Sequence, residues 1–269
     1  MNKKIGVLGC GWLGFPLAIS LIKDGYAVNG STTSKEKIPT LKKKGISPFL
    51  ISLGEQTILG AIDDFLKGLD VLIINVPPKL RKSNTESYIG KIQVLHKALK
   101  QVKPPKILFI SSTSVYGEIN GIVTEETHSK PTTESGKQLL ATENLFLNDS
   151  ELQTTIIRFG GLIGQNRHPI EQLSGKKGLT NGNSYVNLIH LEDCITIIKT
   201  ILENRCWGEI FNGVYPYHPF KKEYYKKQAL LRNLTPPSYA ETTLLGGKRI
   251  SSEKIINKLN YQFKCSIES

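Results

Sequence analysis

The stretch IGVLGCGWLG, residues 5–14, decides the fold expected for this chain. An apolar strand runs into three glycines spaced G-x-G-x-x-G, and an amphipathic helix is expected behind them, over residues 16–22. In such a turn Gly9 permits a sharp bend, Gly11 leaves the backbone bare for a pyrophosphate, and Gly14 lets helix and strand pack closely. The free N–H groups and the positive dipole end of the helix then face the phosphates. The pattern predicts a dinucleotide site; a glycine-rich turn that binds nothing is the alternative.

Composition restricts the class of protein. The 269 residues are enough for one large α/β domain, or for a core domain with a smaller lobe. No apolar run approaches the roughly 20 residues that span a bilayer, and no signal-peptide core precedes the first strand, so we expect no membrane partner. The cysteines lie far apart without C-x-x-C spacing. This predicts no metal site, no disulfide framework and a reduced, cytoplasmic setting.

The formal net charge of +12 raises the question of a nucleic-acid partner. The lysines occur in small groups that are far apart and not interleaved with aromatic residues, which is not typical of a nucleic-acid-binding surface. The first interpretation is a solvated basic surface, because net charge bears on solubility before it bears on partners. The second is an anionic small-molecule substrate.

Strands and helices alternate through the chain as far as residue 159. Strands are predicted at residues 27–31, 49–53, 71–76, 106–110 and 154–159, and helices at 35–43, 85–100 and 135–146. This alternation is typical of an α/β fold with a doubly wound parallel sheet, the Rossmann fold. The less regular second half predicts a small discontinuous C-terminal substrate lobe. We expect a dinucleotide-binding domain of residues 1–163 and 185–213, and a lobe of residues 164–184 and 214–269.

Four segments carry a family resemblance. SSTSVYG at 111–117 resembles the S-S-x-x-V-Y-G segment of extended short-chain dehydrogenases/reductases, the NAD(P)-dependent epimerase/dehydratase group. The stretch from TEE at 124–126 to Pro131 is similar to that group's approach to its catalytic helix. RFGGLIGQNR at 158–167 resembles R-x-x-x-x-x-G-P-G-R, and NLIHLED at 187–193 resembles N-x-I-H-V-x-D. The match covers nearly the full length, and the chain is similar to an atypical branch that begins G-x-G-W-L-G.

The resemblance implies catalytic positions. Members of the group use a Ser or Thr, three residues before the V-Y-G valine, to orient the substrate oxygen. A Y-x-x-x-K pair on the next helix supplies a Tyr whose pKa the Lys lowers, and this Tyr is the general acid or base. Ser112 fills the serine position and Lys137 the lysine position, which leaves Thr133 at the tyrosine position. The pKa of a threonine hydroxyl is far above the value of about 10 for tyrosine, so it cannot simply replace the phenol.

The glycine turn and the resemblance together imply a set of dinucleotide-binding residues. They are Gly9, Gly11, Trp12, Leu13 and Gly14; Ser31, Thr32, Thr33 and Lys35; Val76 and Pro77; Lys137; and Gly160, Gly161 and Leu162. An acidic residue at the end of the second strand would favour NAD, and none is present there. We therefore expect NADP, its 2′-phosphate held by hydroxyls and the Lys35 ammonium, with NAD less favoured. Alternatively, residues 31–35 are only a capped entry to the next helix, with Ser34 as N-cap.

The substrate and the class of function remain open at this point. Arg167 and His168 lie in the expected lobe and are candidates to bind a polar or anionic small molecule. One hypothesis is an enzyme, an NADP-dependent reductase or an epimerase/dehydratase acting on a substrate such as a sugar nucleotide. The other is a non-catalytic NADP(H) sensor. The retained Ser112 and Lys137 favour the enzyme, and the missing tyrosine favours the sensor; a homo-oligomer is compatible with either.

Overall fold

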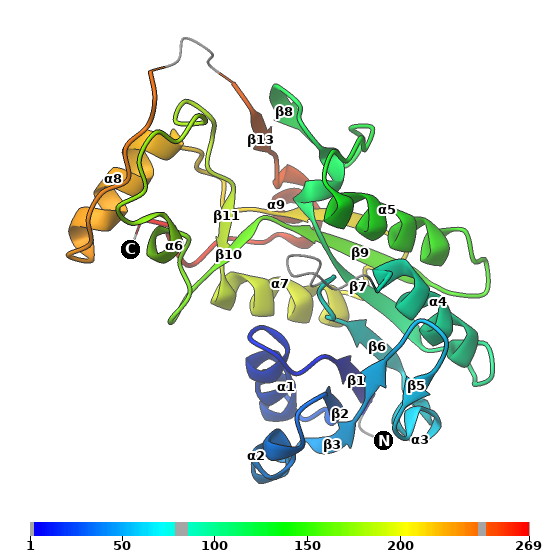
Figure 1. Cartoon of the computed structure of the whole chain (residues 1–269). Helices are drawn as coiled ribbons and strands as arrows, with labels where there is room; N and C mark the ends of the chain where they lie inside the picture. The colour runs from blue at the N-terminus through cyan, green and yellow to red at the C-terminus, as the bar shows by residue number, and fades with distance from the viewer. Residues whose placement is uncertain (1–2, 79–85, 242–245, 269) are drawn as a thin grey trace.

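A parallel sheet forms the centre of the computed structural model, which describes residues 3–78, 86–241 and 246–268 (Figure 1). Within these residues the sheet has seven strands, in the order β12 (Ile210–Gly213), β9 (Thr154–Phe159), β7 (Lys106–Ser112), β6 (Val71–Ile74), β1 (Lys4–Leu8), β2 (Ala27–Thr32) and β3 (Ser47–Leu50). All neighbouring pairs run parallel. The chain order reverses between β1 and β6, so the predicted doubly wound Rossmann fold is confirmed. In such sheets ligands bind outside the carboxyl ends of the strands at this reversal.

Helices cover both faces of the sheet. One face carries α1 (Gly14–Lys23), α2 (Ile38–Lys43), α7 (Leu191–Glu203) and α9 (Glu253–Leu259), and the other carries α3 (Ile62–Leu66), α4 (Tyr88–Leu99) and α5 (Glu134–Leu147). The apolar stripe predicted for α4 is buried at Tyr88, Ile92, Leu95 and Leu99. The expected start of that helix at Thr85 lies outside the described residues. Every residue of β6 is buried, because its two faces both lie under helices.

A smaller lobe stands beside the sheet, with α6 and α8 at the upper left of Figure 1. Its elements are β10 (Gly161–Ile163), α6 (Ile170–Leu173), β11 (Leu188–His190) and α8 (Lys221–Leu231). A separate apolar cluster fills it, with Ile170, Val186 and Tyr224 among its buried members. The pair β8 (Gly121–Val123) and β13 (Lys248–Ile250) joins the end of the chain to the segment after β7.

The end of the chain returns to the sheet. Helix α9 packs against β12 and α7, and its Ile255 and Leu259 are buried in the core on that face. This helix therefore belongs to the packing of the sheet, although residues 214–269 were expected to form the lobe. Asp193, in the first turn of α7, is fully buried and fixes the return. Its carboxylate accepts hydrogen bonds from the Tyr261 hydroxyl (2.6 Å) and from the backbone N–H groups of residues 264 and 265 (2.8 and 3.1 Å).

Some predicted boundaries differ from the structure, and the largest differences lie between residues 35 and 59. The helix expected over 35–43 begins as a 3-10 turn, η1 (Lys35–Lys37), before α2. The strand expected over 49–53 is β3, which ends at Leu50, followed by the short antiparallel pair β4 (Ser52–Leu53) and β5 (Ile58–Leu59). No helix in the described part of the chain is long and apolar enough to cross a bilayer.

Candidate dinucleotide and substrate site

The glycine turn after β1 has a geometry that only glycine can adopt at two of its three positions. Gly9 has φ +104°, and a Cβ there would lie 2.7 Å from the Asn75 carbonyl oxygen. A Cβ on Gly14 would lie 2.1 Å from the Gly9 carbonyl oxygen, so α1 and β1 could not pack as they do. Gly11 is different, because a Cβ there would meet nothing within 4 Å. Its side-chain position is open space, as the approach of a ligand to the backbone requires.

Two neighbouring strands hold this turn in place. The Ser31 hydroxyl, at the end of β2, accepts a hydrogen bond from the Gly9 N–H (2.8 Å), and the Ser31 carbonyl accepts one from the Cys10 N–H (2.8 Å). The Asn75 side-chain amide, just after β6, donates to the Gly9 carbonyl (3.1 Å). Ser31, expected to contact the dinucleotide, is therefore engaged in shaping the turn. Asn75 was not predicted; the only sequence signal was its place at the end of a buried strand.

The start of α1 presents unpaired donors. Within the described residues, the N–H groups of Trp12, Leu13 and Gly14 have no hydrogen-bond acceptor, and no side chain caps the helix. Such N–H groups and the positive end of the helix dipole form a site for an anion. The residues present thus fit the pyrophosphate of a dinucleotide.

The end of β2 offers exposed groups beside internal ones. The Thr32 hydroxyl accepts a hydrogen bond from the Ser34 N–H (3.1 Å), whereas Thr33 and Lys35 are exposed. The Ser34 hydroxyl donates to the Glu36 carboxylate (2.6 Å), and this hydrogen bond lowers the pKa of Glu36. The Ser34 side chain therefore does not cap the following helix, contrary to the alternative drawn from the sequence.

Ser112 ends β7 and opens the 3-10 turn η2 (Thr113–Tyr116). Its hydroxyl oxygen accepts a hydrogen bond from the Ser114 N–H (3.1 Å), which keeps the side chain half-buried at the carboxyl edge of the sheet. Thr133 has a different task. It is the N-cap of α5, its hydroxyl accepting from the Gly136 N–H (3.1 Å), and it is exposed.

Lys137 is exposed on α5, on the side of the helix opposite to the stripe that packs against the sheet. The buried stripe of this helix comprises Gly136, Leu139, Thr142, Glu143 and Phe146. At about 100° per residue, Lys137 lies roughly 160° from the middle of that stripe, and it is exposed. The side chains at helical spacing on the inward side, toward the start of α5, are Ser135 and Leu139. Along α5, all of which is described, the inward face therefore contains neither Tyr nor Lys.

Buried charges fix α5 on the sheet. The carboxylate of Glu143 forms a two-pronged ion pair with Arg158 of β9 (2.6 and 3.1 Å) and accepts a hydrogen bond from the Ser111 hydroxyl (2.5 Å). The Arg158 guanidinium also lies over the Tyr116 ring, 4.8 Å from its centre. Tyr116 is fully buried, burial raises its pKa, and its hydroxyl donates to the Asn212 side chain (2.8 Å). Arg158 and Tyr116 are thus parts of the framework behind Ser112.

Lys248 reaches the same turn from the end of the chain, and sequence reasoning missed it. Its ammonium donates to the carbonyl oxygens of Thr113 (3.1 Å) and Gly117 (2.8 Å), so β13 is tied to η2. Desolvation lowers the pKa of Lys248, and the nearby Lys221 ammonium lowers it further, while Glu118 opposes this. No local motif marks the residue, because its partners lie more than 130 positions earlier.

The expected nicotinamide stretch is close-packed. A Cβ on Gly160 would lie 2.6 Å from the Asn187 carbonyl oxygen, and one on Gly161 would lie 2.6 Å from the Leu188 side chain. Leu162 is half-buried in β10, which pairs with β11.

Two further residues expected to contact the dinucleotide follow β6. The Val76 carbonyl accepts a hydrogen bond from the Tyr88 hydroxyl (2.8 Å), and Pro77 is exposed.

Arg167 and His168 are neighbours in sequence, but the first side chain is exposed and the second is buried. The Arg167 guanidinium is exposed and lies over the Trp12 indole, 4.7 Å from the ring centre. His168 is only 7% exposed, and burial lowers its pKa to about 4. Its Nδ1 accepts from the Ile170 N–H (3.2 Å), and its Nε2 contacts the Tyr224 hydroxyl (3.0 Å), which itself donates to the Ile267 carbonyl. His168 is therefore a neutral core residue of the lobe, not the anion ligand expected from the sequence.

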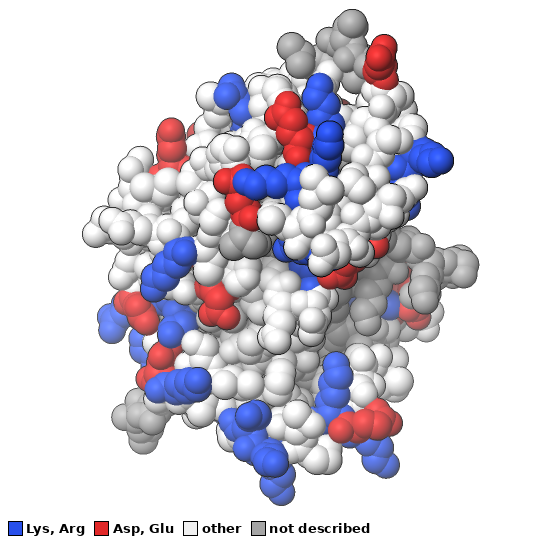
Figure 2. All heavy atoms as spheres, turned by 90° about the vertical axis from the view of Figure 1, so that its left-hand side faces the viewer, with Lys and Arg blue, Asp and Glu red and all other residues white. Residues whose placement is uncertain are grey.

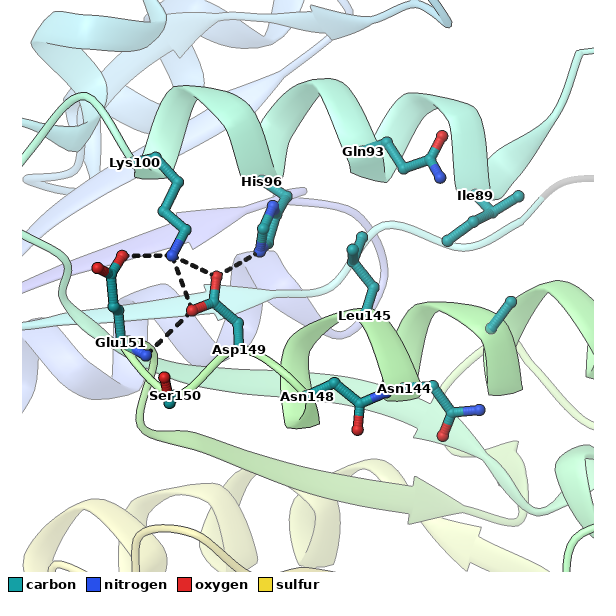
Figure 3. A pocket seen from close by; sticks show the side chains of 11 residues that line it. Ile89, Gln93, His96, Lys100, Asn144, Leu145, Asn148, Asp149, Ser150 and Glu151 are labelled. Atoms are coloured by element: carbon teal, nitrogen blue, oxygen red, sulfur yellow. Dashed lines mark hydrogen bonds and ion pairs between the residues drawn. The ribbon is translucent and has the colours of Figure 1, made fainter.

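A pocket of about 660 Å³ lies elsewhere, between α4, the second half of α5 and the residues that follow α5, 148–151 (Figure 3). Four of its side chains pair with one another: Asp149 contacts His96 (2.7 Å) and Lys100 (2.6 Å), and Lys100 also contacts Glu151. The end of α5 lies at the edge where β9 begins, opposite to the carboxyl edge that carries Ser112. This pocket is therefore separate from the glycine turn.

Charge is mixed over the face shown in Figure 2. Basic and acidic side chains are interspersed there, without a continuous basic stripe. Within the described residues no group of three or more His, Cys, Asp or Glu is placed to hold a metal ion.

Comparisons with known proteins agree with this geometry. Residues 4–130 match the family model described as the NAD binding domain of 6-phosphogluconate dehydrogenase. Protein YeeZ of Escherichia coli K12 is 35% identical over 264 residues, which cover 97% of this chain and 96% of that protein. Among solved structures, the UDP-glucuronic acid 4-epimerase of Bacillus cereus in complex with NAD has a TM-score of 0.80 at 20% identity, covering 99% of this chain and 93% of that one. The dTDP-glucose 4,6-dehydratase of Bacillus anthracis, also with NAD, has a TM-score of 0.78 at 18% identity, with the same coverage. The chain therefore belongs to the same family as YeeZ, and its fold is that of an NAD-bound epimerase and an NAD-bound dehydratase of known structure.

Proposed function

We propose that this protein is an NAD(P)-dependent enzyme of the epimerase/dehydratase or reductase type that acts on a polar small molecule. The observation that supports this best is the open space at Gly11 beside the unpaired N–H groups at the start of α1. Ser112 ends β7, which lies two strands from β1 at the same carboxyl edge of the sheet. Sugar nucleotides are the first substrate class to test, because structural neighbours are described with such compounds.

A bound nicotinamide dinucleotide would accept or donate a hydride. The N–H groups of residues 12–14 would hold its phosphates, and the stretch 160–162 would lie along the nicotinamide. The Ser112 hydroxyl would orient the reacting oxygen of the substrate. Thr133, the N-cap of α5, has no phenol, so another group would carry the proton, and Lys137 would hold the nicotinamide ribose as the family resemblance implies. The lobe formed by residues 164–184 and the parts of 214–241 and 246–252 around α8 and β13 would bind the substrate, with Arg167 exposed toward the glycine turn.

A second candidate is a non-catalytic NADP(H) sensor. The observation that favours it is the inward face of α5, which contains neither a phenol nor an ammonium group. The two functions differ in turnover, not in dinucleotide binding.

We further propose that NADP binds more tightly than NAD. Lys35 and Lys37 are exposed just beyond the end of β2, and Thr33, which precedes them, is exposed as well. The Glu36 carboxylate, which the Ser34 hydroxyl engages, is the group that opposes a 2′-phosphate. Calorimetry with NAD and NADP tests the preference, and a matched pair, Lys35→Gln and Glu36→Gln, should shift it in opposite directions. Tighter binding of NAD by the parent protein would contradict it.

A reduced, cytoplasmic setting is part of the proposal, and all four cysteines are free.

Turnover decides between the two candidate functions. NADPH fluorescence and product analysis on a panel of sugar nucleotides and small carbonyl compounds should detect activity in the parent protein. Ser112→Ala should lower it about 10²-fold or more, the usual scale for losing a group that acts on the reacting oxygen. Parent turnover that Ser112→Ala leaves intact would contradict the placement of the active site. Dinucleotide binding without turnover on the whole panel would support the sensor.

A further inference from the structure

The Trp12 side chain joins the glycine turn to the chain segment that follows β10. Its indole N–H donates to the Gln165 carbonyl oxygen (3.4 Å). The ring also lies against Gly164, where an added Cβ would come within 3.2 Å of the indole Cζ2 atom. Residues 164–167 thus pack against Trp12, although they lie more than 150 positions further along the chain.

Residues 164–167 form a closed turn. The Gly164 N–H donates to the Arg167 carbonyl (3.0 Å), and the Arg167 N–H donates back to the Gly164 carbonyl (3.0 Å). Asn166 adopts a left-handed conformation, with φ +56°, as such a reversal requires. The reciprocal hydrogen bonds fix the point at which the Arg167 side chain leaves the backbone.

This arrangement brings one positive charge to the start of α1. The Arg167 guanidinium lies 4.7 Å from the centre of the Trp12 ring, and the backbone N–H of Trp12 is one of the donors without an acceptor among the described residues. A dinucleotide pyrophosphate carries two negative charges, whereas a helix start contributes only about half a positive charge. A guanidinium can hydrogen-bond phosphate oxygens through two parallel N–H groups while its face stays on an aromatic ring.

We infer that Arg167 binds the pyrophosphate of the dinucleotide. The turn 164–167, which packs against Trp12, would then lie over the phosphates. The inference rests on the proposed dinucleotide site at residues 9–14. It gives Arg167 a partner other than the substrate anion expected from the sequence. Since the turn 164–167 directly follows the stretch 160–163, one chain segment would contact both the nicotinamide and the phosphates.

Trp12 provides a direct optical signal for the test. The chain has two tryptophans, so Trp207→Phe leaves Trp12 as the only one. In that background, ADP-ribose and its 2′-phosphate, which contain the pyrophosphate but no nicotinamide, should change the Trp12 fluorescence on binding. Arg167→Gln should weaken their binding by about 10- to 100-fold, the scale of a lost charge-assisted hydrogen bond. Arg167→Lys, which keeps the charge but not the planar stack, should give an intermediate loss.

The matched control is Arg249→Gln. Arg249 also lies over an aromatic ring, that of Tyr185 (5.3 Å), so its removal costs the same charge and a similar contact in another part of the lobe. It should leave ADP-ribose binding within about twofold of the parent. Equal ADP-ribose affinity for Arg167→Gln and the parent would overturn the inference, as would a loss confined to UDP-glucose. Failure of the parent to bind NAD, NADP or ADP-ribose would instead overturn the proposed dinucleotide site itself.

Discussion

The glycine turn and the start of α5 differ in how much they retain of the pattern that the sequence resemblance implies. At the glycine turn the tight bend, the close helix packing and the open approach at Gly11 are all present. Helix α5 packs on β7, two strands from β1. There Thr133 stands where the sequence resemblance implies a phenol, and the side toward the sheet contains Ser135, Leu139 and Glu143. The glycine turn would bind the dinucleotide through backbone groups, whereas catalysis at α5 would depend on side chains. Because they belong to separate elements, one can persist while the other changes.

The largest effect should come from returning a phenol to the inward face of α5. Ser135→Tyr places the ring on that face, whereas Thr133→Tyr places it at the exposed cap. General acid–base catalysis typically contributes about 10²–10⁴-fold, so Ser135→Tyr should raise the turnover measured by NADPH fluorescence at least 100-fold. Thr133→Tyr should not. Equal turnover of the two variants, with unchanged melting temperatures, would show that α5 does not face the reacting atoms.

Gly11→Val should remove dinucleotide binding without disturbing the fold. Nothing lies within 4 Å of the added Cβ in the free protein, so the melting temperature should stay the same. The side chain would fill the space of the pyrophosphate, and calorimetry should show an affinity loss of about 100-fold or more. The matched control is Gly14→Val, whose Cβ would lie 2.1 Å from a carbonyl oxygen and should lower both affinity and melting temperature. Undiminished binding by Gly11→Val would place the dinucleotide elsewhere.

Acid should weaken the lobe through His168. Burial lowers the pKa of this side chain from 6.5 to about 4, so its folded value lies below its unfolded value. The neutral imidazole therefore stabilises the fold above pH 6.5, and this contribution is lost as the pH falls toward 4, to a total of up to about 3 kcal/mol. Denaturant unfolding at several pH values should show this slope, and His168→Asn should reduce it. An unchanged slope in the variant would assign the acid sensitivity to other groups.

The smallest effect should come from removing the cap of α5. Thr133→Ala loses the hydrogen bond to the Gly136 N–H and should cost about 1 kcal/mol of unfolding free energy. Thr133→Ser keeps an acceptor and should cost less. Dinucleotide affinity should be the same in both, since the cap lies on the outer side. A change in affinity with Thr133→Ala would instead indicate that this residue contacts the dinucleotide.

The sequence predicted what depends on local spacing. The glycine turn, the buried strand β6 and the apolar stripe of α4 all follow from patterns within about a dozen residues, and the structure confirms them. The rotation of α5 could not be predicted in this way, because Thr133 and Lys137 have the same four-residue spacing whichever side of the helix faces inward. That rotation is set by Glu143 pairing with Arg158 on another strand.

Contacts between distant parts of the chain could not be predicted for the same reason. His168 is buried by Tyr224, and Lys248 acts on a turn far earlier in the chain, so no neighbouring residue signals either contact. The dinucleotide preference, the domain limits and the substrate contacts remain predictions.

The buried carboxylate of Asp193 has a consequence for how the chain folds as it is made. Its three partners lie 68 to 72 residues further along. At roughly 5–20 residues per second, a ribosome needs several seconds to add that length. During this interval the start of α7 holds a charge whose hydrogen-bond donors do not yet exist. The sheet face beneath α7 therefore stays incomplete until residues 261–265 have emerged, and the nascent chain passes through a state in which its first strands can pair while this face remains open to water.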